Sequence, residues 1–317
     1  MITCRLKMQL KNRHLQTILA SSKIRLLRLL IKNKIKQQSK KVKLDLKSAT
    51  LEGYIAQNKN NERLYILLHG WEGSAQSTYI QLLANELFNK KQASIFRLNF
   101  RDHGETHHLN KELFHSCRLR EVCEAIKKVS VDYPHKKVYL CGFSLGGNFA
   151  IRVASKAQEY GISLTKVFAI SPPLNPKNSM MAIEKSRMYS RYFLKKWLKS
   201  LSKKQAIFPS NFENSQYKKI KSLDKLTEVL ILKNTDYNTT DEYFKDYEIN
   251  KKILGKTLVP IYILMAKDDP VIPYEDFYIL KNQEKIKLVI TNHGGHCGFI
   301  TGLRLKSLVE KKIIENS

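Results

Sequence analysis

A serine lies between glycines at the point where an apolar segment ends. Residues 142–147 read G-F-S-L-G-G and follow the short apolar run 138–141, with helical periodicity from Leu145 to about residue 160. Where a strand turns sharply into a helix, glycines let the backbone pass close by and the serine hydroxyl is exposed. The spacing therefore predicts Ser144 as a nucleophile. The alternative is a glycine-rich turn that carries a surface serine.

An anion that develops on an attacked carbonyl oxygen requires N–H donors. The N-terminus of the helix after Ser144 offers the free N–H of Leu145 and a partial positive charge. A second donor is expected in the loop after the apolar run 64–68, where the sequence reads H-G-W and ends at Trp71. We predict an oxyanion hole formed by the backbone N–H groups of Trp71 and Leu145.

Two neighbouring acids follow the apolar run 258–265. The loop after this predicted strand is where a carboxylate that orients a catalytic histidine is expected. Asp269 directly precedes the stretch P-V-I-P and is the predicted acid. Asp268 is the alternative, and either carboxylate could instead cap the turn.

Two histidines, separated by two glycines, follow the last predicted strand at 286–290. A catalytic histidine takes the serine proton on one ring nitrogen while the acid holds the other nitrogen. His296, at the far end of the glycine loop, is the predicted base, and His293 is the alternative. Cys297 is a rival nucleophile, but we favour its interpretation as a small buried side chain beside this loop.

A second cluster of reactive side chains occurs in the stretch 101–108, which reads R-D-H-G-E-T-H-H. Clustered histidines and acids can bind zinc. The candidate ligands share one loop and have no regular spacing; they are Asp102, His103, Glu105, His107 and His108. We expect no metal and no cofactor.

Apolar runs alternate with helical patterns along the chain and must position these residues. Continuous apolar runs predict buried strands, and apolar residues three or four apart predict helices. The predicted strands are 42–46, 51–56, 64–68, 93–100, 138–141, 164–170, 258–265 and 286–290, and the predicted helices are 78–89, 117–129, 145–160 and 302–314. The alternation favours an α/β fold with a mostly parallel, doubly wound sheet. We expect one domain over 1–317, with a helical lid inserted at 174–257.

Composition limits the cellular setting. No apolar run reaches the roughly 18–20 residues that a membrane span requires. Residues 1–10 carry scattered charges and no continuous apolar core, so we expect no secretory signal. The five cysteines have no C-x-x-C spacing, which favours free thiols in a reducing cytoplasm.

The chain is strongly basic. Lys and Arg outnumber Asp and Glu by 56 to 28, a balance typical of proteins with anionic partners. The lysines are spread along the chain and no nucleic-acid motif accompanies them, so we favour a compositional bias and expect no nucleic-acid partner.

One basic segment, 24–43, stands out from this diffuse charge. Residues 24–36 predict an amphipathic helix with an apolar stripe and basic flanks; the stripe is Ile24, Leu27, Leu30 and Ile31, and the flanks include Arg25, Arg28 and Lys32. Such a helix can lie on an anionic membrane. The alternative is that its apolar stripe packs on its own domain.

The motifs, taken in order, resemble the AB hydrolase 4 family of α/β-hydrolases, which are cytoplasmic in bacteria and membrane-associated in animals. The matching stretches extend over almost the whole chain and are N-R-H-L-Q-T at 12–17, H-G-W-E-G-S at 69–74, N-F-R at 99–101, G-F-S-L-G-G-N at 142–148, D-D-P at 268–270 and G-G-H at 294–296. The resemblance implies the α/β-hydrolase fold and a triad of Ser144, Asp269 and His296.

The chain also departs from that family. Arg13 replaces a proline, the stretch D-H-G-E-T-H-H at 102–108 replaces the usual R-G-C/S-G, and the acidic D-G-D turn is missing near Gly53. The triad is untouched by these changes. They indicate a distinct branch, whose substrate preference depends on the loops around its pocket.

We therefore predict a serine hydrolase that cleaves a carboxylic ester, of short to medium acyl length, through an acyl-enzyme on Ser144. The expected substrate is a small ester or an acyl lipid, and the expected location is the cytoplasm or its membrane surface. The alternatives are a membrane-surface lipase or phospholipase, an acyl thioesterase, and a non-catalytic binding protein of the same fold. The same triad serves esters and thioesters, so the sequence leaves that choice open.

Overall fold

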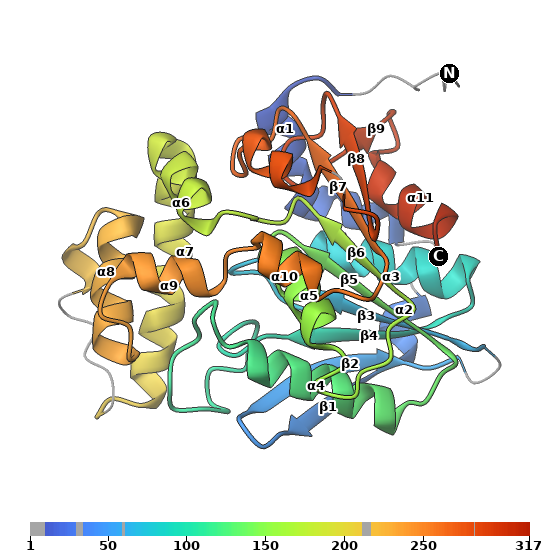
Figure 1. Ribbon diagram of the computed structural model, residues 1–317, viewed down its shortest axis with the longest axis horizontal. Coiled ribbons are helices and arrows are strands. Elements are labelled where there is room, and N and C mark those ends of the chain that lie inside the picture. Colours follow the sequence, from blue (N-terminus) through green and yellow to red (C-terminus); the bar gives the residue numbers. More distant parts are fainter. Residues whose placement is uncertain (1–9, 30–33, 59–60, 211–216, 282) are drawn as a thin grey trace.

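A central sheet of mostly parallel strands carries helices on both of its faces (Figure 1). The computed structural model describes residues 10–29, 34–58, 61–210, 217–281 and 283–317. Within these residues eight strands form one sheet in the order β1-β2-β4-β3-β5-β6-β7-β8. At one edge β2 pairs antiparallel with both β1 and β4, and all neighbouring strands from β4 to β8 pair parallel. The strands are β1 Ser39–Asp45, β2 Thr50–Ala56, β3 Arg63–Leu68, β4 Ser94–Asn99, β5 Lys137–Phe143, β6 Lys166–Ile170, β7 Ile261–Ala266 and β8 Ile286–Thr291. The predicted α/β class and mostly parallel sheet are confirmed.

Helices from the two halves of the chain cover the sheet. On one face α3 packs against α1, η1 and α11, and on the other face α5 packs against α4 and α10. Their bounds are α1 Arg13–Ser21, the 3₁₀ helix η1 Lys23–Leu29, α2 Lys34–Gln38, α3 Thr78–Lys90, α4 Leu119–Asp132, α5 Leu145–Lys156, the 3₁₀ helix η3 Tyr274–Leu280 and α11 Leu308–Glu315. This arrangement buries both faces of the central strands.

The apolar run of β3 shows why the central strands are continuous in hydrophobicity. Successive side chains of a strand point to opposite faces of the sheet. Leu64 and Ile66 lie in the core beneath α4 and α5, whereas Tyr65 and Leu67 lie in the core beneath α3. Because each face meets a helix layer, no position of the run can be polar without burying an unpaired group.

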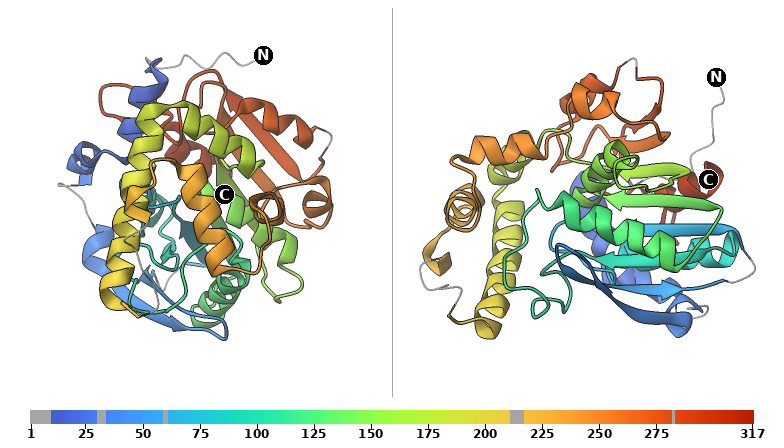
Figure 2. Two further views of the ribbon diagram at one scale, coloured as in Figure 1. Left: turned by 90° about the vertical axis from the view of Figure 1, so that its left-hand side faces the viewer. Right: turned by 60° about the horizontal axis from the view of Figure 1, so that its bottom comes forward.

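The stretch between β6 and β7 forms helices that stand together beside the sheet (Figures 1 and 2). The described elements of this stretch are α6 Pro176–Lys185, α7 Arg187–Ile207, the 3₁₀ helix η2 Tyr217–Lys219, α8 Leu223–Asn234, α9 Thr240–Asp246 and α10 Lys251–Gly255. Asn175, Ser222, Thr239 and Asn250 cap α6, α8, α9 and α10 with their side-chain oxygens. The capping residues explain where these helices begin.

Several predicted elements start later than the sequence pattern suggests, and two of these shifts have a clear physical reason. Strand β7 begins at Ile261 rather than at 258, because Pro260 has no N–H for the sheet ladder and Leu258 is exposed. The helix predicted at 302–314 begins at Leu308. The residues before it pair as the short strands β9 Ile300–Thr301 and β10 Lys306–Ser307, and the Ser307 side chain caps the helix.

The basic segment 24–43 does not form the predicted helix. Residues 23–29 form η1, residues 34–38 form α2, and Lys40, Lys41 and Lys43 belong to β1. Arg25, predicted on a basic flank of that helix, is 1% exposed, because its guanidinium binds Glu310 and the carbonyl of Ala20. Leu30, Ile31 and Lys32 lie outside the described residues, as do residues 1–9, which include Cys4 and most of the segment considered for a secretory signal.

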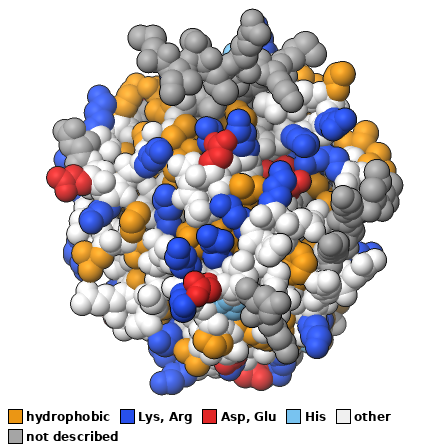
Figure 3. Space-filling model, turned by 90° about the vertical axis from the view of Figure 1, so that its right-hand side faces the viewer, with side chains coloured by type: hydrophobic (Ala, Val, Ile, Leu, Met, Phe, Trp, Pro, Cys, Tyr) orange, Lys and Arg blue, Asp and Glu red, His pale blue; other side chains and the backbone are white. Residues whose placement is uncertain are grey.

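The positive charge is diffuse on the face drawn in Figure 3. Lys and Arg side chains are scattered there among apolar and uncharged groups, without gathering over one element. Among the described helices, none is long and apolar enough to cross a bilayer. The distribution agrees with a compositional origin of the charge on this face.

Candidate active site

The turn between β5 and α5 presents Ser144 in a conformation that few residues adopt. Its φ of 51° and ψ of −121° lie outside the usual regions for a residue with a Cβ. The glycines beside it are required: a Cβ on Gly142 would lie 2.0 Å from the carbonyl oxygen of Gly146, and one on Gly146 would lie 2.5 Å from that of His69. The turn therefore depends on close backbone packing between β3, β5 and α5.

A chain of hydrogen bonds connects Ser144, His296 and Asp269. The Oγ of Ser144 lies 2.9 Å from Nε2 of His296, and Nδ1 of the same ring lies 2.9 Å from Oδ2 of Asp269. Since the Asp269 carboxylate accepts from Nδ1–H, Nε2 is left with a lone pair for the serine proton. Ser144 follows β5, Asp269 follows β7 and His296 follows β8, so the ends of three parallel strands bring them together.

The two candidate acids have different partners. Oδ1 of Asp269 also accepts from the backbone N–H groups of Val271 and Ile272, at 2.8 and 3.0 Å, which fixes the carboxylate. Asp268 instead accepts from the N–H groups of Gly294 and Gly295, both at 2.9 Å, and its other oxygen lies 3.3 Å from Nδ1 of His293. Asp268 and His293 thus hold the loop 293–296 that follows β8, called the histidine loop below. Asp269 and His296 instead face Ser144.

The ionisation of His296 depends on its buried carboxylate neighbour. Burial alone lowers the pKa of the ring, but the Asp269 carboxylate, with a fully buried side chain, and the neighbouring Cys297 together outweigh it. The pKa of His296 is therefore raised well above the usual 6.5. A ring that gains affinity for a proton is suited to accept one from a hydroxyl group.

Of the two residues predicted to bind an oxyanion, Leu145 follows Ser144 directly and Trp71 follows Gly70, which packs against Ser144. Leu145 is the first residue of α5, where the N–H has no acceptor within the helix. Gly70 approaches the nucleophile so closely that a Cβ there would lie 3.2 Å from the Cβ of Ser144, and Trp71 follows directly. The Trp71 ring stacks on Phe193 of α7 with ring centroids 5.3 Å apart. The loop is thus held against the helices between β6 and β7.

The N-terminal helix α1 supports the histidine loop, a role that the sequence did not reveal. The backbone N–H of His296 donates to Oγ1 of Thr17 at 2.9 Å. The side chain of Gln16 binds the backbone N–H and C=O of Ile300, at 2.6 and 3.2 Å. A Cβ on Gly295 would lie 2.4 Å from the carbonyl oxygen of Arg13, so this glycine permits the contact between helix and loop.

The loop that follows β4 uses its polar residues for internal contacts. Asp102 forms a buried ion pair with Lys204 of α7 at 2.7 Å, and Nε2 of His107 lies 2.8 Å from the hydroxyl of Ser200. His108 and Glu105 are exposed. Among the described residues, no three His, Cys, Asp or Glu side chains are grouped in a way that could hold a metal ion.

Cys297 lies beside the site, where it borders the cavity next to His296. Its side chain is buried, and its thiol lies 3.8 Å from the carbonyl oxygen of Ile170 on β6. Ser144, by contrast, is bound to the ring of His296. The geometry agrees with the interpretation of Cys297 as a buried filler.

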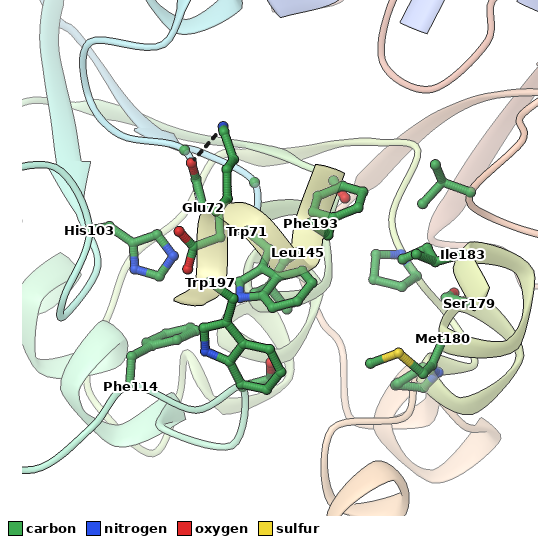
Figure 4. A pocket seen from close by; sticks show the side chains of 18 of the residues that line it. Trp71, Glu72, His103, Phe114, Leu145, Ser179, Met180, Ile183, Phe193 and Trp197 are labelled. Atoms are coloured by element: carbon green, nitrogen blue, oxygen red, sulfur yellow. Dashed lines mark hydrogen bonds between the residues drawn. The ribbon is translucent and has the colours of Figure 1, made fainter. Parts of the chain in front are cut away.

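A cavity of about 520 Å³ opens at Ser144 and His296. Its walls come from the loops after β3 and β4 and from the helices between β6 and β7 (Figure 4). Its lining is mainly apolar and includes Trp71, Phe114, Met180, Ile183, Phe193, Trp197 and Leu230. A volume in this range suits a small ligand rather than a polymer.

Comparisons with known proteins agree with this fold and site. A sequence model of the alpha/beta hydrolase fold family matches residues 65–303. YheT of Escherichia coli (strain K12), whose name classes it provisionally as an esterase, is 25% identical over 79% of this chain and 74% of its own. Monoacylglycerol lipase of Saccharomyces cerevisiae is 22% identical over 74% of this chain and 54% of its own, and monoacylglycerol lipase ABHD2 of Mus musculus is 26% identical over 54% and 44%. The chain thus spans about half the length of the yeast and mouse relatives.

Solved structures share the architecture at low sequence identity. An esterase of Pyrococcus furiosus, Pf2001, is 17% identical with a TM-score of 0.60, over 87% of this chain and 89% of its own. An esterase of Pyrobaculum calidifontis is 16% identical with a TM-score of 0.60, over 95% and 89%. Likeness at this level shows the fold, and the curated relatives fit the AB hydrolase 4 resemblance of the motifs. With three quarters of its length matched by the family model, the chain belongs to the alpha/beta hydrolase fold family.

Proposed function

We propose that the protein is a serine hydrolase that cleaves a carboxylic ester through an acyl-enzyme on Ser144. The observation that carries the proposal is the chain from the Ser144 hydroxyl through the His296 ring to the buried Asp269 carboxylate, at the wall of an apolar cavity. The names of the Escherichia coli, yeast and mouse relatives support an ester as the substrate.

In the first step His296 takes the proton of Ser144 while Oγ attacks the carbonyl carbon. The backbone N–H groups of Trp71 and Leu145 stabilise the oxyanion, and one such donor contributes about 10²–10³-fold to the rate. The protonated ring then gives its proton to the leaving alcohol. Water attacks the acyl-enzyme with His296 again as base, which releases the acid and restores the hydroxyl.

The helices between β6 and β7 would act as a lid, with the acyl group bound beneath them. Their apolar side chains line the cavity together with Trp71 and Leu145, which favours an acyl chain over a charged substrate. The range 174–257 is proposed as this lid within one domain. The four described cysteines are free thiols, which supports a location in the reducing cytoplasm.

Labelling with a fluorophosphonate probe tests the proposal, because such a probe reacts with an activated serine. We expect the wild type to be labelled and Ser144→Ala to remain unlabelled, with Cys297→Ala labelled like the wild type. Hydrolysis of p-nitrophenyl esters and acyl-CoA thioesters of equal chain length then separates esterase from thioesterase. A folded wild type that is not labelled contradicts catalysis and favours a binding protein of the same fold.

A second candidate is a lipase that works at a membrane surface. Apolar side chains are exposed at the mouth of the cavity: Ile18 of α1 and Met188 and Tyr192 of α7 line it and are 53%, 47% and 46% exposed. A hydrogen bond of 2.9 Å between His14 and Tyr189 holds α1 against α7, so these side chains belong to one surface. A basic protein with such a surface suits an anionic bilayer.

Sedimentation with anionic vesicles in high salt tests this candidate. Salt removes diffuse electrostatic attraction, whereas apolar insertion persists. We expect the double variant Ile18→Ser, Met188→Ser to lose binding. The control Val131→Ser removes an apolar side chain of similar exposure from α4, elsewhere on the molecule (Figure 1). A wild type that stays in the supernatant eliminates the candidate.

A further inference from the structure

The charged side chains that line the cavity come from three segments. Glu72 follows β3, Asp102 follows β4, and Lys196 and Lys204 belong to α7. Asp102 and Lys204 neutralise each other at 2.7 Å, and the ammonium group also donates to the carbonyl of His107. This pair is therefore fully engaged, which leaves the Glu72 carboxyl group, with the Lys196 ammonium nearby, as the charged group that can interact with a ligand.

Glu72 is held in an unusual conformation next to the predicted oxyanion donor Trp71. Its φ is 54°, in the left-handed region, and Lys196 donates to its backbone carbonyl at 3.1 Å rather than to its carboxyl group. Burial raises the pKa of the Glu72 carboxyl to about 7. Within the described part of the chain, no hydrogen bond or ion pair of this carboxyl group is found. The loop thus directs a poorly solvated carboxyl into the cavity without a partner.

His103 stands beside this carboxyl with a nitrogen that also lacks a partner. Its Nδ1 lies 2.7 Å from the carbonyl of Arg101, so Nδ1 carries the hydrogen and Nε2 is an acceptor. Burial and the ring of His69 keep the pKa of His103 well below 6.5, so the ring is neutral. Nε2 is buried and has no hydrogen bond within the described residues. In Figure 4 the Glu72 carboxyl is directed toward this ring.

The chemistry of these groups selects a neutral hydrogen-bond donor. The Glu72 carboxylate needs a hydrogen to accept and opposes an anionic ligand, while the nearby Lys196 ammonium opposes a cationic one. A hydroxyl group meets these conditions because it donates one hydrogen and accepts another. Leaving the carboxyl unpaired when the cavity is filled has a large cost, so a ligand that supplies a hydroxyl is favoured.

The polar groups lie on the opposite side of the cavity from the apolar ones. In Figure 4 Ser179, Met180 and Ile183 of α6 face Glu72 and His103 across Leu145, the neighbour of Ser144. With the acyl chain against α6, the other part of the ester, its alcohol, points toward Glu72. We propose that Glu72, flanked by His103 and Lys196, forms a polar subsite that binds a hydroxyl group on the alcohol part of the substrate. This inference rests on the proposed ester hydrolysis.

Two esters of the same fatty acid test the subsite, the 2,3-dihydroxypropyl ester and the propyl ester, which differ only in hydroxyl groups. We expect the wild type to prefer the dihydroxypropyl ester, measured as the ratio of the two kcat/KM values, by about tenfold or more. Glu72→Leu should bring this ratio close to one, whereas Glu72→Gln, which keeps a hydrogen-bonding group of the same shape, should retain most of it. Using the ratio cancels any general loss of activity in a variant.

Controls separate this inference from the proposed function. Glu105→Gln changes an exposed acid of the neighbouring loop, which forms an ion pair with Lys203, and should leave the ratio unaltered. Fluorophosphonate labelling reports whether Ser144 remains active in each variant. A labelled wild type with a ratio near one, or a labelled Glu72→Leu with an unchanged ratio, overturns the subsite and leaves the hydrolase intact. The wild-type ratio needs no variant, so misfolding of Glu72→Leu does not remove the test.

Discussion

The hydroxyl of Thr17 accepts a hydrogen bond of 2.9 Å from the backbone N–H of His296, 279 positions further along the chain. The same hydroxyl donates to the carbonyl of Arg13 at 2.8 Å, which fixes its orientation within α1. The first helix of the described chain is thereby joined to the loop that carries the proposed base. This contact gives a physical role to the N-R-H-L-Q-T stretch at 12–17.

Replacing Thr17 with Val should lower kcat more than it raises KM, because the loop of His296 loses an anchor while the cavity keeps its shape. Loss of one such bond costs about 1 kcal/mol and leaves a buried N–H without an acceptor, so we expect a fall in kcat of about tenfold. Steady-state kinetics on a p-nitrophenyl ester measure it. Thr17→Ser restores the acceptor and should recover most of the rate; a variant with wild-type kcat would contradict the anchoring role.

The two adjacent acids should differ sharply in their effect on catalysis. Asp269→Asn removes the charge that orients and stabilises the His296 ring, and a change of this kind lowers kcat by about 10⁴-fold in a serine protease. Asp268→Asn keeps an oxygen for the N–H groups of Gly294 and Gly295, so its loss should be far smaller. Equal losses of kcat in the two variants would show that Asp269 is not the acid that orients His296.

The rate should depend on pH through His296. The ring must be neutral to accept the Ser144 proton, and the Asp269 carboxylate raises its pKa well above 6.5. Consequently kcat/KM should fall as the pH decreases, with a midpoint above pH 6.5. In Asp269→Asn the midpoint should move to lower pH, because the charge that favours the protonated ring is absent. If the midpoint does not move in this variant, Asp269 is not the cause of the raised pKa of His296.

Two neighbouring lysines of α7 provide a matched pair for stability. Lys204→Met leaves the buried Asp102 carboxylate without its partner, and breaking such a pair costs about 3–5 kcal/mol of the free energy of unfolding. Lys203→Met removes only a contact with the exposed Glu105 and should cost under about 1 kcal/mol. Denaturant unfolding measures both, and similar values for the two variants would contradict a buried pair that holds α7 to the loop after β4.

The sequence predicted the elements whose residues all face apolar surroundings. The runs at 64–68 and 138–141 became β3 and β5 because both faces of the sheet are covered, so hydrophobic pattern and environment coincide. It also predicted the chain order of Ser144, Asp269 and His296, since each follows a strand of a parallel sheet. The hydrophobic pattern of a strand and the order of strands along the chain can both be read from a single sequence.

Contacts between residues far apart in the sequence could not be predicted from the hydrophobic pattern. Arg25 was predicted on a basic flank of an amphipathic helix, yet it is buried and binds Glu310 near the other end of the chain. The separate roles of Asp268 and Asp269 depend on which backbone N–H groups surround each carboxylate, and neighbouring letters do not reveal them. Glu72 drew notice only as part of a motif, because the fold is what leaves its carboxyl group without a hydrogen-bond partner among the described residues.

Ser144 has a backbone conformation that glycine would adopt freely, and a side chain held in such a region costs the fold about 1–3 kcal/mol. The residue proposed to react is therefore a burden on the architecture that surrounds it. A glycine at this position of the turn between β5 and α5 would relieve the strain but would also remove the hydroxyl group proposed to react.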